Sequence, residues 1–145
     1  MSDELRWDIA PQVTRAGEED TDATDSGDAV RVAGVSPGHT GARRLWFGRV
    51  SNKPGYRSLP HYHGEAETGG FVFSGHGRIY YGPGYRQYVD MTVGDWVFVP
   101  PYMPHVEANM STTEDLVWIT TRTPDNIVVN LADVDDGELE GYRRA

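Results

Sequence analysis

Residues 55–77 read GYRSLPHYHGEAETGGFVFSGHG, and this stretch decides both the fold and the site that the sequence predicts. It places His61 and His63 two positions apart, in a short segment bounded by Pro60 and Gly64. Because the side chains of a strand alternate between its two faces, both imidazoles project to the same side. Two imidazoles on one face form half of a metal site.

A third histidine and three further candidates complete the predicted site. His105 ends the segment PPYMPH, whose prolines stiffen the loop that holds its imidazole. Glu67 follows His63 by four residues, within reach as an oxygen ligand. Glu107 points the same way as His105 if the chain is extended there, and His39, in SPGHTG, is a distant residue that could fold over the site. The fourth ligand is open among Glu67, Glu107 and His39, and either glutamate can act as the catalytic base if it does not bind the metal.

Two sequence motifs resemble those of the cupins. The first cupin motif is a glycine, five residues, H-x-H, three or four residues, a glutamate, six residues and a glycine. The second is a glycine, five residues, P-x-G, two residues, a histidine, three residues and an asparagine. The matching positions are Gly55, His61-Tyr62-His63, Glu67 and Gly75 in the first motif, and Gly94, Pro100-Pro101-Tyr102, His105 and Asn109 in the second. The resemblance covers residues 40–131 and implies a metal site in which Glu67 is the fourth ligand.

The chain departs from these motifs at two places. Seven residues separate Glu67 from Gly75, one more than the motif has, so that Thr68 can occupy the usual acidic position. Tyr102 stands where the second motif has a glycine, which changes the turn before His105.

The distribution of apolar residues predicts an all-β fold. Short runs rich in Val, Ile, Phe, Tyr and Trp alternate with Gly and Pro turns, as in sandwiches and barrels. We expect a single cupin jelly-roll β-sandwich domain at residues 30–131, between an acidic segment at 1–29 and an acidic tail at 132–145 that forms at most one short helical turn. The expected strands are 30–35, 42–51, 56–63, 69–74, 77–82, 86–92, 95–99, 105–110, 114–122 and 126–131.

Composition narrows the class of protein. The chain has 145 residues, enough for one domain with its own core, and no cysteine, which excludes disulfides and thiolate chemistry. No apolar run approaches the length of a membrane span, and the N-terminus lacks the pattern of a signal peptide, so a cytoplasmic location is expected by default. The net charge of −9 is concentrated at the two ends. The sequence has no cluster of basic residues, so we expect neither nucleic acid nor a membrane as a partner.

The predicted function follows from the ligands and the aromatic residues. Histidine ligands suit zinc, our first expectation, and also iron, nickel, copper, manganese and cobalt. Aromatic residues are 11% of the chain, and the inward-facing half would line a cavity above the metal that suits a flat, oxygen-rich substrate. We therefore expect a metal-dependent enzyme that acts on an aromatic or polyketide-type substrate. The metal would act as a Lewis acid on a ketone, and aldol closure and loss of water would follow. The chain also resembles the small cupin cyclases of bacterial aromatic polyketide pathways, such as those of the resistomycin type. This resemblance implies a polyketide cyclase of antibiotic biosynthesis with a histidine-dominated site, which favours His39 over Glu67.

Two alternatives and one assembly are also predicted. The same ligands suit a metal-dependent dioxygenase of the quercetinase type, and the fold alone suits a non-catalytic cupin that binds a small molecule. The N-terminal segment alternates Leu5, Trp7 and Ile9, which suits either a strand added to the sheet of a partner or a frayed terminus, and we expect a homodimer. Residues 14–29 have almost no apolar content and are expected to form a flexible loop.

Overall fold

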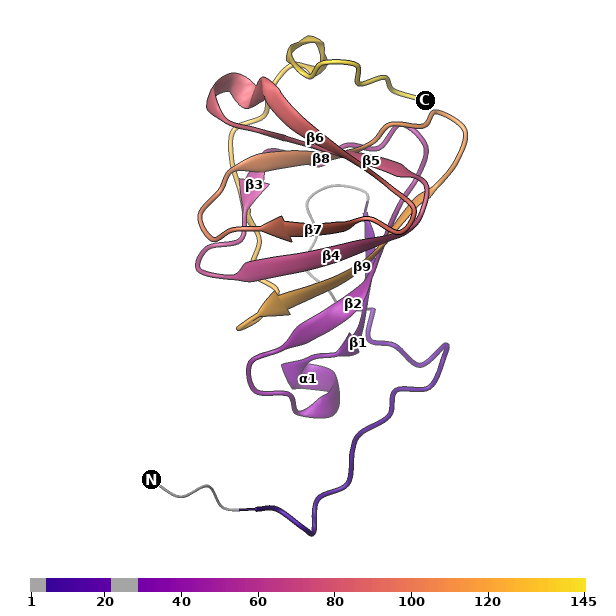
Figure 1. The fold of residues 1–145 in the computed structure, drawn as a ribbon, viewed down its shortest axis with the longest axis vertical. Coiled ribbons are helices and arrows are strands. Elements are labelled where there is room, and N and C mark those ends of the chain that lie inside the picture. The colour runs from indigo at the N-terminus through magenta and orange to yellow at the C-terminus, as the bar shows by residue number, and fades with distance from the viewer. Residues whose placement is uncertain (1–4, 22–28) are drawn as a thin grey trace.

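The computed structural model describes residues 5–21 and 29–145, which form two five-stranded antiparallel sheets that face each other (Figure 1). The first sheet has the order β1-β2-β9-β4-β7, and the second has the order β10-β3-β8-β5-β6. The strands are β1 (Val30–Val35), β2 (Trp46–Asn52), β3 (His61–Tyr62), β4 (Glu67–Ser74), β5 (His76–Tyr81), β6 (Gln87–Thr92), β7 (Trp96–Val99), β8 (His105–Asn109), β9 (Leu116–Thr123) and β10 (Val129–Asn130). The predicted all-β jelly roll is confirmed, and every expected strand overlaps one of these.

Among residues 5–21 and 29–145, helical structure is confined to short turns. They are α1 (Pro37–Thr40), η1 (Pro83–Tyr85) and η2 (Asp136–Glu138). No helix in the part of the chain that the structure describes is long and apolar enough to cross a membrane.

The core lies between the two sheets and is built by strict alternation along the strands. In β2, Trp46 and Val50 are buried while Phe47, between them, is 45% exposed. In β9, Leu116 and Trp118 are buried in the same way, and the indole N–H of Trp118 donates to the Asn52 side-chain oxygen at 2.9 Å. Such alternation is what one buried face per sheet requires.

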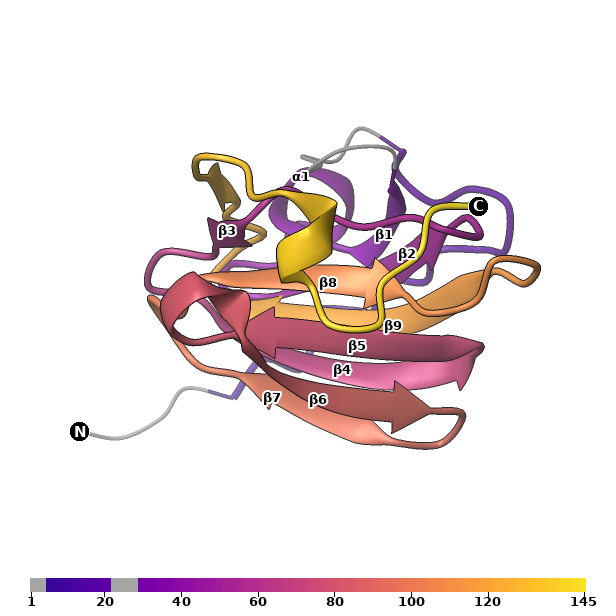
Figure 2. The ribbon, with the colours of Figure 1, turned by 90° about the horizontal axis from the view of Figure 1, so that it is seen from above.

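The outer face of the second sheet is covered by the C-terminal segment (Figure 2). Leu139 and Tyr142 pack with Val106, Ala108 and Tyr80 in one buried cluster. The segment expected to be an acidic tail is therefore part of the packed structure, and η2 is its single helical turn.

Within the described residues, most of the outer face of the first sheet has no such cover, and only residues 12–20 lie along its β1 edge. Its exposed apolar side chains include Phe47, Phe73, Trp96 and Phe98, with Leu45 beside them. The N-terminal segment leaves the edge of this face and extends away from both sheets, with Leu5, Trp7 and Ile9 exposed (Figure 1).

Part of the predicted flexible loop at 14–29 is held to the first sheet. Asp20 and Ala33 form an isolated β-bridge, with backbone hydrogen bonds of 2.9 and 2.7 Å. The rest of that prediction, at residues 22–28, lies outside the described residues, as do residues 1–4 of the N-terminal segment.

Candidate metal centre

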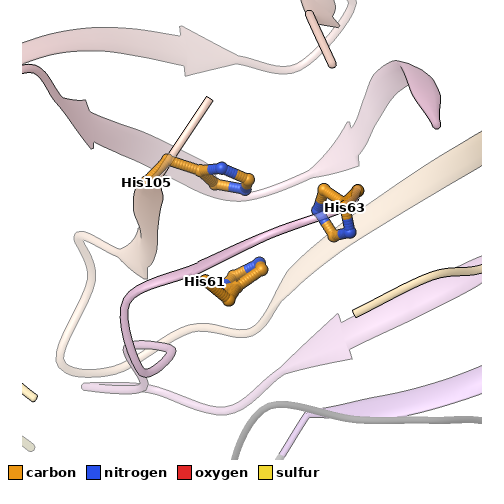
Figure 3. Close-up of side chains that lie close together, drawn as sticks. All are labelled: His61, His63 and His105. Carbon is orange, nitrogen blue, oxygen red and sulfur yellow. The ribbon is translucent and has the colours of Figure 1, made fainter. Parts of the chain in front are cut away.

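Three imidazoles converge between the two sheets (Figure 3). His61 in β3 and His105 at the start of β8 are direct partners in the antiparallel register, and His63 follows β3 on the same side as His61. The ring centroids are 4.4 Å apart for His61 and His105, 4.9 Å for His61 and His63, and 5.1 Å for His63 and His105. One ligand atom from each ring lies within 4.8 Å of the other two. The predicted convergence of three histidines on one point is therefore present.

The outward nitrogen of each ring is held by a backbone carbonyl. The Nδ1 atoms of His61, His63 and His105 lie 2.7, 2.7 and 3.0 Å from the carbonyl oxygens of Leu59, Ile127 and Met103, respectively. A carbonyl oxygen only accepts hydrogen bonds, so each Nδ1 must carry the proton. Each Nε2 is then left with a lone pair, which is the tautomer that a metal-binding histidine needs.

Burial keeps these imidazoles neutral. It lowers the pKa of His105 to about 4, with the neighbouring His61 acting in the same direction. Burial likewise lowers the pKa of His61 and, together with the Arg122 charge, that of His63. The Nε2 atom of His61 is buried and has no hydrogen-bond partner. Three neutral acceptors aimed at one another, with one left unsatisfied, fit a divalent cation as the missing partner.

Glu67, the predicted fourth ligand, is not brought to the imidazoles. Strand β4 begins at Glu67, whose side chain is exposed, and the next residue, Thr68, is buried at 5% exposure on the inner face. A shift of one residue along a strand moves a side chain to the opposite face. The extra residue between Glu67 and Gly75 therefore turns the carboxylate outward and puts the Thr68 hydroxyl in its place.

His39 also lies away from the site. It belongs to α1, which is exposed, and it is not one of the three residues that converge. The SPGHTG segment forms a short helical turn with Gly41 in the left-handed conformation at its end, instead of folding over the imidazoles.

Glu107 is the carboxylate that does reach the site. It lines the same cavity as His63 and His105, two positions along β8 from His105 as expected for one strand face. Burial acts to raise the pKa of the Glu107 carboxyl, but neighbouring positive charges, those of the Arg31 and Arg122 side chains among them, outweigh it, so the pKa lies below its usual value. The Arg31 guanidinium forms an ion pair with Glu107 at 3.6 Å. Glu107 is thus an ionised carboxylate beside the imidazoles.

Sequence reasoning missed Arg122, which reaches the site from β9. Its side chain is buried, its Nη2 lies 3.4 Å from His63 Nε2, and burial lowers its pKa to about 10. The sequence did carry one signal. Residues 116, 118, 120 and 122 of β9 alternate inward, and after Leu116, Trp118 and Thr120 the next inward position is the charged Arg122.

The interior cavity is much smaller than a lined aromatic pocket would be. Its volume is about 20 Å³, room for little more than one water or ion. Trp46 and Trp118 do point inward, but they pack in the core. Phe73 and Trp96 face outward and are 63% and 78% exposed, because they occupy the alternate positions of β4 and β7.

Comparison with known families places the chain. The model of the Cupin domain matches residues 48–122, a span that includes all three histidines. The protein therefore belongs to the cupin domain family. No curated protein sequence matches the chain significantly.

Solved structures share this fold at low identity. An uncharacterised conserved protein with a double-stranded β-helix domain from Klebsiella pneumoniae is 17% identical, with a TM-score of 0.61, over 77% of this chain and 90% of that one. Oxalate decarboxylase from Bacillus subtilis is 20% identical with a TM-score of 0.61, over 74% of this chain and 28% of the enzyme. A further structure of that enzyme, described for its Mn(II) centres, is 18% identical with a TM-score of 0.63, over 79% and 30%. The chain thus spans less than a third of the decarboxylase, and the likeness is one of fold.

Proposed function

We propose that the protein is a metal-dependent enzyme that acts on an oxygen-rich small molecule, and that its reaction is the aldol-type cyclisation and dehydration of a polyketide. The observation that carries the proposal is the pairing of two kinds of group in one buried site. Three neutral imidazoles point their Nε2 lone pairs at one another, and an ionised carboxylate that is not among them, Glu107, lines the same cavity.

The residues have separate roles in this reaction. His61, His63 and His105 would hold one divalent cation, with zinc as the first candidate. The bound cation would supply Lewis-acid chemistry, polarising a substrate carbonyl and lowering the pKa of the neighbouring C–H. Glu107 accepts the proton from that carbon, because it is ionised and buried close to the imidazoles. The surrounding core excludes water from the reacting atoms.

The test measures metal and chemistry together. The protein as purified is analysed for metals, and the exchange of the methyl protons of acetophenone for deuterium is followed by NMR. We expect His61→Ala and His105→Ala to lose both the metal and the exchange, while His39→Ala, the matched exposed histidine, keeps both. Glu107→Gln should keep the metal and lose exchange by about 100-fold or more.

The outcomes separate the alternatives. Exchange that persists in a metal-free variant would overturn the mechanism. Loss of metal in Glu107→Gln would make Glu107 a ligand instead of the base. The assay is repeated without oxygen, because a cyclase is indifferent to oxygen, whereas consumption of oxygen would favour the quercetinase-type dioxygenase that the same ligands also suit. Acetophenone binding without any exchange would favour the non-catalytic binding cupin.

We also propose that two copies associate through the outer face of the first sheet. The N-terminal arm of each copy, the segment that carries Leu5, Trp7 and Ile9, would lie on the other copy. The support is an apolar face and an apolar arm in one chain that do not cover each other: Trp96 is 78% and Trp7 is 88% exposed. Contiguous exposed apolar surface of this kind marks an interface. Light scattering after size exclusion should show a dimer that Trp96→Glu converts to a monomer, while Val93→Glu, which replaces an exposed apolar residue of a turn, leaves it intact. A wild-type monomer at 100 μM would contradict the assembly.

A further inference from the structure

The Arg122 guanidinium is fixed beside the imidazoles by neutral partners. Its Nε donates to Thr68 Oγ1 at 3.0 Å, and its Nη1 donates to Asn126 Oδ1 at 2.8 Å. Its Nη2 lies 3.4 Å from His63 Nε2, and the residue is 3% exposed. Hydroxyl, amide and imidazole are the partners, and none of them carries a negative charge.

A buried cation in such surroundings is stabilised by an anion. Removing a guanidinium from water is costly unless a negative partner compensates it. Within the described residues, no ion pair joins Arg122 to a carboxylate. The one acidic side chain that these residues bring to the cavity, Glu107, forms its ion pair with Arg31, and its charge acts on Arg122 only from beyond ion-pair distance. A divalent cation on the imidazoles would add two positive charges next to Arg122. An anion placed between the two cations would be attracted by both.

The register of the first sheet makes this arrangement specific. Thr68 and Arg122 are direct partners on the neighbouring strands β4 and β9, and both point into the cavity. Thr68 occupies the inner position where a carboxylate from the chain would have supplied a negative charge. The pair instead presents a hydroxyl and a guanidinium, and Glu107, the one carboxylate that the described residues bring to the cavity, forms no ion pair with Arg122.

We propose that Arg122 and the three-imidazole site together bind an anionic oxygen group of the substrate, a carboxylate or an enolate, and that the substrate is therefore an acid or a readily enolised carbonyl compound. This inference rests on the proposed function, because it assigns the substrate class of the same site. The planar fork of a guanidinium matches a pair of oxygens. The cavity of about 20 Å³ admits only a small group, so the oxygens enter first.

Formate is the probe, because it is the smallest carboxylate, and formamide is its neutral counterpart of nearly the same shape. The protein is loaded with Co²⁺, whose visible spectrum changes when a new group enters the coordination shell of the metal. Metal content is measured separately. We expect formate to change the spectrum and formamide to have no effect at the same concentration. In Arg122→Gln, formate should bind at least tenfold more weakly with the metal retained, because a charge-assisted hydrogen bond is lost.

Two further variants serve as controls. Arg122→Lys keeps the charge and should recover part of the affinity, and Arg49→Gln, an exposed arginine on the outer face of the same sheet, should bind formate as the wild type does. A second readout needs no metal: formate should raise the melting temperature of the metal-free wild type and not that of Arg122→Gln. If Arg122→Gln does not fold, Thr68→Val replaces it, since this variant removes the hydroxyl that orients Nε, and weaker formate binding is again expected.

Failure of this inference is distinguishable from failure of the proposed function. A wild type that retains no metal would contradict the proposed function, while the melting experiment would still decide the role of Arg122. A wild type that holds metal but binds formate and formamide alike, or an Arg122→Gln variant that binds formate as tightly as the wild type, would overturn the anion site alone.

Discussion

The two sheets of this domain differ in what covers their outer faces. On the second sheet, Val106 and Ala108 are 0% and 1% exposed, because the C-terminal segment lies over them (Figure 2). On the first sheet, the comparable outer residues Phe73 and Trp96 are 63% and 78% exposed. The inner faces are alike in being buried, so the difference arises entirely from what the rest of the chain does after the strands are made.

The difference shows which apolar side chains are buried by the fold of one chain and which remain exposed. Apolar side chains that the chain itself buries contribute to the stability of the monomer, at about 25 cal/mol for each Å² removed from water. Apolar side chains left exposed contribute nothing until something else covers them. The second sheet is completed by its own chain, whereas the outer face of the first sheet stays exposed, and we propose that a second copy covers it.

The largest effect should come from trimming one apolar side chain on each outer face. Leu139 is 2% exposed, so Leu139→Ala removes buried methyl groups and should lower the free energy of unfolding by about 2–4 kcal/mol. Phe73→Ala removes a larger side chain but should cost only about 0.5 kcal/mol in the monomer, because the ring is mostly in water already. Urea unfolding at low protein concentration measures both. Equal costs would mean that the two faces do not differ in solution.

Local patterns account for what the sequence predicted well. The H-x-H segment has to place both rings on one side, since alternation along an extended chain requires it. The prolines before His105 restrict the backbone conformations of the loop that positions its imidazole. The strands were found because runs of β-branched and aromatic residues end at Gly and Pro. The strand expected at 56–63 shortened to β3, because Pro60 cannot donate a ladder hydrogen bond.

Features that depend on long-range register were not predictable. Whether Glu67 or Thr68 faces inward is decided by pairing with β9, more than fifty residues later in the chain, and sequence alone left both possible. The role of Arg122 arises from that same pairing. Leu139 and Tyr142 were overlooked because they stand among acidic residues, which made the C-terminal segment read as a solvated tail.

The smallest effect should be seen in how the cover on the second sheet responds to acid. The side chain of Arg57 donates to Asp133 and to Asp136, each at 2.8 Å, and so holds the C-terminal segment onto the sheet. Hydrogen bonding from Arg57 lowers the pKa of Asp133, and hydrogen bonding from Arg144, followed by Arg57, lowers that of Asp136. The Asp133 carboxylate is 56% exposed and that of Asp136 is 36% exposed, so water screens the ion pairs, which contribute no more than about 1 kcal/mol.

The sign of the acid response follows from the direction of these pKa shifts. A carboxyl whose pKa is lower in the folded protein stabilises the fold above its ordinary pKa of 3.8, and this contribution disappears as the pH falls through the lower folded value. Hydrogen exchange of the Leu139 amide, which donates to the Asp136 carbonyl at 3.0 Å, should therefore quicken as the pH drops below about 4, beyond the intrinsic change of exchange rate with pH. Asp133→Asn should weaken this response, and Asp115→Asn, in an exposed turn, should leave it unchanged. An identical acid response in Asp133→Asn would show that apolar packing of Leu139 and Tyr142 alone holds the cover in place.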